Sequence, residues 1–295
     1  MPSYALMVVG QPSLDRNTDY LGNSVREVGG AVVYASYAAA ALGHSVLALA
    51  KCNSAEIDIH AVFAKATAVT IAPCLSDSST SISNTYHTAD RERRSCRAIS
   101  RITAYTPAEL PEADAAICHI AGLMRGDIDE SVIEAAAKRS DVALDVQGFL
   151  RCARDDGTME FEDWPRKREL FPLLRFLKTD AAEAEILTGT GDRRRAAAMF
   201  FDWGAREIMI THNTEVLLYD GKKYYTQPLC PRNLSGRSGR GDTCFATYIT
   251  ERLTRDIPDA LLTAAALVSL KMESPGPFTG SREDVEAYIR AFYAN

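Results

Sequence analysis

The sequence has no long apolar run and no excess of positive charge. Its 295 residues include 33 lysines and arginines against 39 aspartates and glutamates, a formal net charge of −6. This balance argues against nucleic-acid binding, which depends on basic residues that neutralise backbone phosphates. The longest stretch of small apolar residues, 31–42, is too short and too polar to span a bilayer. We therefore expect a small-molecule substrate, with neither nucleic acid nor a membrane as partner.

Signals for secretion and for a metal centre are also missing. The first ten residues lack the basic segment of a signal peptide. The seven cysteines form an odd set without a Cys-x-x-Cys pair, and the five histidines lie too far apart for a metal motif. We interpret the cysteines as reduced thiols and predict a cytoplasmic location.

Two common nucleotide-binding motifs are absent. No Gly-x-Gly-x-x-Gly follows the first apolar segment, which disfavours a dinucleotide oxidoreductase. No Gly-x-x-x-x-Gly-Lys-Ser/Thr occurs either, which disfavours a P-loop kinase.

Short apolar runs alternate with helical patterns along most of the chain. Strands are expected at 4–10, 46–50, 69–72, 115–120, 142–145, 176–178 and 207–211. Helices are expected at 31–42, 55–66, 128–139, 181–187, 193–203 and 243–253. This alternation predicts an α/β fold, a doubly wound and mostly parallel sheet with helices on both faces. Ligands of such sheets bind at the carboxyl ends of the strands.

Two segments depart from this alternation. Residues 15–28 are polar and carry no core pattern, whereas 80–101 alternate like an antiparallel hairpin with its turn at 88–91. Because a two-stranded ribbon is marginal alone, it must pack on something. We predict a single domain, 1–295, with a small β lid formed by about 11–28 and 78–102. Two ordinary surface excursions are the alternative.

The end of the chain shows two further patterns. A second hairpin is predicted at 215–225, with Asp220 and Gly221 in its turn. Residues 256–295 are predicted to form helices with a break at 274–277, where two prolines flank a glycine.

A loop rich in glycine, serine and arginine, 236–241, precedes one of the predicted helices. Free backbone N–H groups at a helix start favour an anion, and glycines let a phosphate approach the backbone closely. Asp242 then stands where a carboxylate takes a proton from a hydroxyl beside that phosphate. The pattern favours phosphoryl transfer to an alcohol. The alternative is an aspartate N-cap after a flexible loop.

Polar residues at other strand ends add to this pattern. Asp15, just past the first strand, is suited to accept hydrogen bonds from two hydroxyls of a polyol. Gly29 and Gly30 permit close backbone approach to a ligand. Asp180 and Glu183, three residues apart at a helix start, can hold Mg²⁺ through water. Each has a plainer alternative: a turn aspartate, a loop leading into a helix, and acidic residues that complement a helix dipole.

Taken in order, these elements resemble the PfkB (ribokinase-like) family of carbohydrate kinases across essentially the whole chain. The family's late motif, Thr-Gly-Ala-Gly-Asp-Thr-Phe, is similar to Ser238-Gly239-Arg240-Gly241-Asp242-Thr243-Cys244.

The resemblance implies a set of roles for these residues. ATP is the phosphoryl donor, with Mg²⁺ on its phosphates, and Asp242 is the base. N–H groups of Gly239, Arg240 and Gly241 stabilise the transferring phosphoryl. Asp15 binds substrate hydroxyls, and Glu183 with Asp180 belongs to the Mg²⁺ network. The remaining nucleotide contacts would come from Lys178, Asp180, Thr211 and Asn213.

The chain also departs from the family pattern. Asp180 replaces the usual asparagine, and Arg240 replaces the usual alanine of the anion loop. The Thr-x-Gly pattern on the purine side appears as Thr211-His212-Asn213, without its glycine. Tyr34 stands where many sugar kinases of the family carry asparagine, which argues against ribokinase-type sugar recognition.

The acceptor is predicted from one further likeness. The segment Val-Ala-Leu-Asp-Val-Gln-Gly-Phe-Leu-Arg, 142–151, is similar to the middle strand and loop of the family's myo-inositol kinase branch. In that interpretation Gln147 and Arg151 contact substrate, with Gly29, Gly30, Tyr34 and Tyr86 nearby. We favour a polyol or cyclitol.

Two alternative functions stay open at this point. A nucleoside kinase would use tyrosines such as Tyr34, Tyr37 or Tyr86 to stack on a base. A non-catalytic ligand-binding relative would explain the altered metal and nucleotide motifs. Unpaired lid edges also make a homodimer through the lid plausible.

Overall fold

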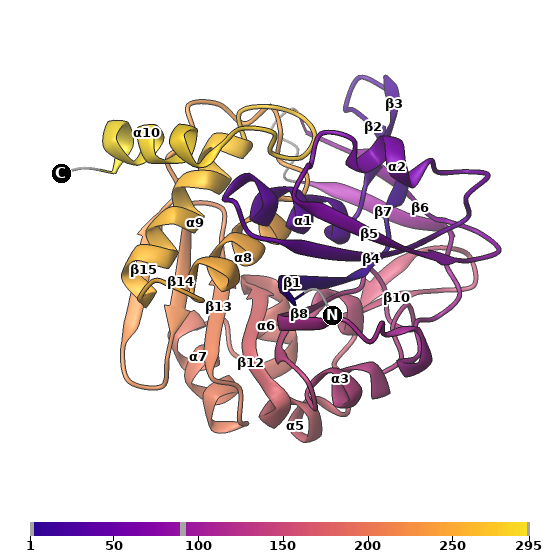
Figure 1. Ribbon diagram of the computed structural model, residues 1–295. Helices are drawn as coiled ribbons and strands as arrows, with labels where there is room; N and C mark the ends of the chain where they lie inside the picture. Colours follow the sequence, from indigo (N-terminus) through magenta and orange to yellow (C-terminus); the bar gives the residue numbers. More distant parts are fainter. Residues whose placement is uncertain (1–2, 89–92, 294–295) are drawn as a thin grey trace.

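The computed structural model describes residues 3–88 and 93–293 and is built around a nine-stranded sheet (Figure 1). Seven neighbouring strands are parallel, and β14 and β15 complete one edge in antiparallel pairing. The strand order is β15 (Tyr224–Pro228), β14 (Glu215–Tyr219), β13 (Glu207–Thr211), β12 (Leu174–Asp180), β9 (Asp141–Asp145), β8 (Asp114–Ala121), β1 (Ser3–Gly10), β4 (Val46–Cys52) and β5 (Val69–Leu75).

Helices cover both faces of this sheet because its strands bury side chains on both sides. Along β1, Leu6 and Val8 enter one core cluster and Met7 and Val9 the other, as the twofold period of a strand requires. The first cluster packs under α1 (Ala31–Ala41), α2 (Ile59–Phe63), α8 (Arg240–Glu251), α9 (Ile257–Lys271) and α10 (Arg282–Phe292). The second packs under α3 (Ser131–Ala136), α4 (Gln147–Leu150), α5 (Lys167–Leu170), α6 (Ala181–Thr188) and α7 (Arg193–Asp202). The predicted fold class is confirmed.

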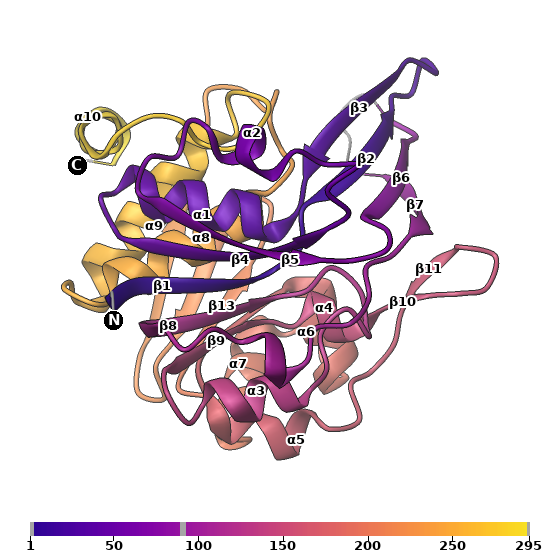
Figure 2. The ribbon, with the colours of Figure 1, turned by 45° about the vertical axis from the view of Figure 1, so that its right-hand side comes forward.

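A second, four-stranded sheet lies beside the carboxyl ends of the large sheet's strands (Figure 2). Its order is β3 (Ser24–Gly29), β2 (Ser13–Thr18), β6 (Thr80–Tyr86) and β7 (Arg94–Ser100). The central pair, β2 and β6, is parallel, and both outer pairs are antiparallel. The two segments expected to form a lid therefore share one sheet. The predicted turn at 88–91 lies largely outside the described residues.

Several elements differ from the sequence-based expectation. Residues 15–28 form part of a β-hairpin, which the sequence did not indicate because β3 is exposed along nearly its whole length and lacks an apolar face. The helix expected over 55–66 is limited to α2, where the Asp58 carboxylate caps the N–H groups of His60 and Ala61. The helix expected from 243 begins at Arg240. A short hairpin of β10 (Arg151–Ala153) and β11 (Met159–Phe161) was not predicted.

The hairpin predicted at 215–225 is present. The Asp220 carboxylate accepts hydrogen bonds from the N–H groups of Lys222 (2.8 Å) and Lys223 (2.7 Å), and Gly221 adopts a φ of +87°. Two 3₁₀ turns, η1 (Pro107–Glu109) and η2 (Phe171–Leu173), complete the elements. Within the described ranges no helix is both long enough and apolar enough to cross a membrane.

The strand order places a crevice at one point of the large sheet. After β1 the chain first extends the sheet through β4 and β5, then returns to the other side of β1 with β8. At such a reversal, the connections beyond the carboxyl ends of the strands diverge and leave a ligand-sized space. The ends of β1 and β8, at Gly10 and Ala121, are paired there.

Candidate active site

Two adjoining cavities lie at the carboxyl ends of the strands. The junction cavity, about 110 Å³, lies between the two sheets, and the glycine-loop cavity, about 330 Å³, lies against residues 236–241. They share five lining residues: Tyr86, Gln147, Ser238, Gly239 and Asp242. The junction cavity is further lined by Ser13, Asp15, Gly30, Ala31, Tyr34, Ile82, Asn84, Leu123 and Arg151. The glycine-loop cavity is further lined by Lys178, Asp180, Thr211, Asn213, Arg237, Arg240 and Gly241.

Asp242 belongs to the wall that the two cavities share. It lies in the first turn of α8, whose N-cap is Gly239, so Asp242 is not the helix cap that the plainer interpretation suggested. Burial and the nearby Asp145 carboxylate raise the pKa of Asp242 to about 6, against opposing effects of Lys178 and Arg151. Its carboxylate is therefore ionised at neutral pH yet more basic than an ordinary aspartate, as a general base requires.

Gly239 shows why the loop before α8 needs a glycine. Its φ is +72°, and a Cβ there would lie 2.1 Å from Cγ of the Tyr34 ring. No side-chain hydrogen bond caps α8 at this residue, and the first N–H groups of any helix have no partner within the helix. The backbone of Gly239, Arg240 and Gly241 lines the glycine-loop cavity, so this helix start is suited to an anion.

Gly30 has a similar constraint at the start of α1. Its φ is +102°, and a Cβ would lie 2.3 Å from the carbonyl oxygen of Gln11 and 2.8 Å from Cα of Pro12. The close approach that the paired glycines permit is thus to the chain after β1. A Cβ on Gly29 would in turn lie 3.1 Å from a carboxylate oxygen of Asp15.

A buried ion pair lies beneath the glycine loop. The Lys178 ammonium is 2.8 Å from a carboxylate oxygen of Asp145, at the ends of β12 and β9, and both side chains are buried. Burial alone would lower the pKa of Lys178, but Asp145, Glu183 and Asp242 together raise it well above its usual value. A Cβ on Gly241 would lie 3.1 Å from the ammonium nitrogen, so this fixed positive charge supports the loop from below.

Asp180 and Glu183 form a capping box at the start of α6. The Asp180 carboxylate accepts from the N–H of Glu183, and the Glu183 carboxylate accepts from the N–H of Asp180, both at 2.8 Å. Burial raises the pKa of Glu183 to about 8, although Lys178 opposes the shift. Asp180 reaches the glycine-loop cavity and Glu183 lies behind it. Across the described chain, no three histidine, cysteine or carboxylate side chains converge as a protein-only metal site.

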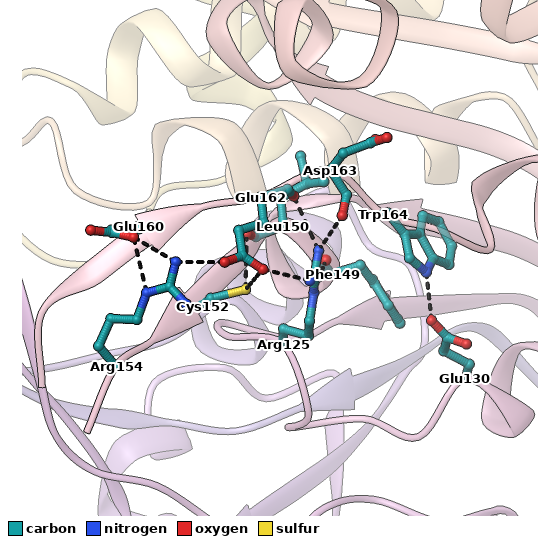
Figure 3. A network of polar contacts seen from close by, with 10 residues as sticks. All are labelled: Arg125, Glu130, Phe149, Leu150, Cys152, Arg154, Glu160, Glu162, Asp163 and Trp164. Atoms are coloured by element: carbon teal, nitrogen blue, oxygen red, sulfur yellow. Dashed lines mark hydrogen bonds and ion pairs between the residues drawn. The ribbon is translucent and has the colours of Figure 1, made fainter.

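Arg151 enters the junction cavity from the start of the β10–β11 hairpin, and it donates to the Gln147 side-chain oxygen at 3.2 Å. Arg125 holds this region in place. Its guanidinium donates to the carbonyls of Phe149 and Asp163, each at 2.7 Å, and to Glu162, as Figure 3 shows. The backbone on both sides of the hairpin is thereby held by the donors of one partly buried guanidinium.

Comparisons with solved structures agree with this geometry. A pyrophosphate-dependent kinase in the ribokinase family, in a sulfate complex, is 31% identical over 96% of this chain and 99% of its own, with a TM-score of 0.87. This chain belongs to the ribokinase family. The predicted likeness to the PfkB carbohydrate kinases, and to their myo-inositol kinase-like branch, is confirmed.

Two further structures extend the comparison of this ribokinase-family kinase. A pyrophosphate-dependent kinase complexed with a pyrophosphate analog and myo-inositol is 30% identical, with a TM-score of 0.87 over 96% of this chain and 99% of that one. Arabidopsis thaliana ribokinase, complexed with ribose and ATP, shares the fold at 16% identity, with a TM-score of 0.76 over 98% of this chain and 99% of its own. No family model matches the sequence. No curated protein matches it either.

The ribokinase-family chain brings nearly all of the sequence-predicted residues to the two cavities. The exceptions are Gly29, which lies against Asp15, and Glu183, which lies behind Asp180. Sequence reasoning missed Asn84, Asp145 and Arg237. Arg237 could have been predicted, because it lies within the predicted glycine-rich loop. For Asp145 the one signal was a charged residue at the end of an apolar strand. Asn84 gave no signal, because its strand alternates with serine and threonine.

Proposed function

We propose that this kinase transfers a phosphoryl group from inorganic pyrophosphate to a hydroxyl of a cyclitol such as myo-inositol. The observation that carries the proposal is the shared wall of the two cavities, where Asp242 stands between an anion-binding helix start and a polar junction cavity. The acceptor would occupy the junction cavity and the donor the glycine-loop cavity. The second sheet would serve as a lid over the acceptor.

The charges around the glycine-loop cavity support pyrophosphate as donor. Lys178, Arg237 and Arg240 place three cationic side chains on its lining, and guanidinium groups bind phosphate oxygens in pairs. The one aromatic residue among its described lining is Tyr86, which also borders the junction cavity. Two solved structures that are about 30% identical to this chain are those of pyrophosphate-dependent kinases.

ATP, the donor expected from the sequence, is the second candidate. Its support is the shared fold with ribokinases whose structures are complexes with ATP. Against it stands the Thr211-His212-Asn213 segment, which lacks the family's glycine. There the Asn213 side-chain oxygen accepts a hydrogen bond from Arg240 at 3.1 Å.

The lining of the junction cavity supports a cyclitol acceptor. Asp15, Asn84, Gln147 and Arg151 surround it with hydrogen-bonding groups, which suits a ring with a hydroxyl on each carbon. Two of the three tyrosines that could stack on a nucleoside base already pack against other residues of the protein. The Tyr34 ring packs on Gly239, as the clash of a Cβ there requires, and Tyr37 stacks on Phe63 while donating to the Val62 carbonyl at 2.8 Å.

In the proposed mechanism Asp242 accepts the proton of the attacking hydroxyl. The hydroxyl oxygen forms a bond to one phosphorus while the bond from that phosphorus to the bridging oxygen breaks, releasing inorganic phosphate. N–H groups at the start of α8, with Arg240, would stabilise the charge on the transferring phosphoryl. The residues fit a phosphate-borne Mg²⁺, since such ions keep several waters and need few carboxylates. Asp180 would hold it, with Glu183 behind, and bound Mg²⁺ would neutralise donor charge.

A donor and acceptor panel tests this function. We expect 31P NMR to show a phosphate ester from myo-inositol and pyrophosphate, at a rate well above that with ATP. Arg237→Gln and Arg240→Gln should each raise KM for pyrophosphate about tenfold or more, because each removes hydrogen bonds to a charged ligand. KM for myo-inositol should stay unchanged.

The control for both variants is Arg195→Gln, an exposed arginine of α7 that lines neither cavity. Turnover with ATP but not with pyrophosphate would refute pyrophosphate as donor, and the assignment as a kinase would stand. Binding of pyrophosphate without an ester from any polyol, sugar or nucleoside would instead favour the non-catalytic relative.

The pKa of Asp242 sets an expected acid limit on activity. A base must be ionised to accept a proton, and the pKa of Asp242 is raised to about 6 in the folded protein. We expect kcat/KM for the acceptor to be constant near neutral pH and to fall tenfold per pH unit below about 6. A pH–rate profile measures this. Activity that is unchanged down to pH 4 would exclude Asp242 as the base.

A further inference from the structure

A buried lysine outside the two cavities contacts the glycine loop from its far side. Lys271, at the end of α9, is 2% exposed, and its ammonium donates hydrogen bonds to the carbonyl oxygens of Gly236 and Ser238. The same ammonium lies 5.2 Å from the centroid of the Tyr34 ring, against which Gly239 packs. One cation thus joins α9, α1 and the loop that precedes α8.

The backbone holds the same loop next to Lys271. The N–H of Gly236 donates to the carbonyl of Met272 at 2.7 Å, and a Cβ on Gly236 would lie 1.7 Å from the carbonyl oxygen of Ser274. The loop therefore enters against the end of α9 with no room for a side chain. Directly after this point, the carbonyl groups of Gly236 and Ser238 accept the hydrogen bonds from Lys271.

Peptide planarity converts these contacts into an orientation. In a trans peptide the C=O and the following N–H point in opposite directions. When Lys271 draws the carbonyls of Gly236 and Ser238 toward itself, the N–H groups of Arg237 and Gly239 point away from it. Both of these residues line the glycine-loop cavity.

We propose that Lys271 is a positioning residue that orients the loop 236–241 through its positive charge. The inference rests on the proposed phosphoryl transfer for its role but on the contacts above for its geometry.

The surroundings of Lys271 have opposing effects on the pKa of its ammonium group. Burial lowers the pKa of Lys271 to about 8, and Asp242 and Glu27 oppose the shift. The Tyr34 ring faces it as well. The ammonium therefore loses its proton as pH rises through about 8, and the loop contacts weaken with it.

The experiment compares Lys271→Ala with Lys51→Ala. Lys51 is the matched control, because its environment resembles that of Lys271. It too is 2% exposed, its ammonium donates to a backbone carbonyl (Ala104, 2.9 Å), and it lies 4.7 Å from the ring centroid of a tyrosine (Tyr105). We expect Lys271→Ala to lower kcat about a hundredfold through a misplaced loop. Millimolar ammonium, methylammonium or potassium ions should restore part of that rate in a saturable manner, and Lys51→Ala should gain nothing from them.

Two readouts separate this inference from the proposed function. Amide hydrogen exchange over 236–241, in protein without any ligand, should accelerate in Lys271→Ala and not in Lys51→Ala. In Lys271→Arg the fall in activity above about pH 8 should disappear, because arginine stays charged. If wild type were inactive with every donor, the proposed function would fail and the exchange data would still decide the role of Lys271.

Two results would overturn the inference. The first is unchanged exchange of 236–241 in Lys271→Ala. The second is a loss of activity in Lys271→Ala that no cation restores while the melting temperature falls, which would make Lys271 a packing residue only.

Discussion

Asp242→Asn is expected to lower kcat by roughly 100- to 10,000-fold, the usual contribution of a positioned general base. Asparagine has nearly the same shape but cannot accept the hydroxyl proton. Binding of donor and acceptor should persist, because the other residues of both cavities are unchanged. Steady-state kinetics with pyrophosphate and myo-inositol would show the loss in kcat rather than in either KM.

The folded state should tolerate this substitution. In the folded protein burial raises the pKa of Asp242 to about 6, so keeping it ionised at neutral pH lowers the stability of the folded state relative to the unfolded chain. A neutral asparagine removes that cost, and the melting temperature should not fall. Asp202→Asn, at an exposed residue of α7, is the matched control. A variant at position 242 that retains more than about a tenth of wild-type kcat would refute the base.

Glu251→Gln is expected to lower the free energy of unfolding by about 3 to 5 kcal/mol, as breaking a buried ion pair usually does. Glu251 is fully buried at the end of α8. Its carboxylate lies 2.8 Å from His44 after α1, 2.7 Å from Arg282 of α10 and 2.8 Å from Arg255. The neutral amide would leave Arg255 and Arg282 without their shared anion and His44 without its carboxylate partner. Urea denaturation and thermal melting measure the loss.

The stabilising effect of Glu251 should depend on pH. Burial alone would raise the pKa of Glu251, but hydrogen bonds from His44 and Arg282, with the Arg282 charge, lower it from 4.5 to about 2. The contribution to stability is therefore present above about pH 4.5 and is lost as pH falls toward 2. The difference between wild type and Glu251→Gln should shrink over that window.

An exposed ion pair provides the comparison for Glu251. Glu169→Gln breaks a surface contact with Arg166, and the Glu169 side chain is 61% exposed. Water and salt screen such an exposed pair, so this variant should have nearly the same stability as the wild type. A Glu251→Gln protein as stable as Glu169→Gln would show that the buried cluster contributes nothing net.

The large sheet could be predicted because its strands are buried on both faces. Strands such as β1 and β4 are continuous apolar runs, and the helices between them carry their own period. The second sheet was predicted only in part. β6 alternates between buried and partly buried residues and was recognised, whereas β3 holds its place by backbone pairing to β2 and shows no apolar face. Pairing of this kind leaves no trace in composition.

Site residues could be predicted where a motif required a special backbone. Gly239, Gly241 and Asp242 lie at a helix start, and the two glycines indicate its backbone geometry from the sequence alone. Lys271 could not be found in the same way, because a lysine at the end of an apolar helix is expected to point to solvent or to complement the dipole. Its partners are carbonyl groups 33 and 35 residues away, which only the folded chain brings together.

Apart from the five residues that they share, the two cavities are lined by different parts of the chain. Asp15, Asn84 and Tyr86 come from the second sheet, whereas the glycine-loop cavity is lined mainly by the ends of β12 and β13 and by the loop before α8. Of the second sheet, only Tyr86 reaches the glycine-loop cavity. Under the proposed function, substitutions in 13–29 and 80–100 would change the acceptor with little effect on the phosphoryl donor, and substitutions around the loop before α8 would do the reverse.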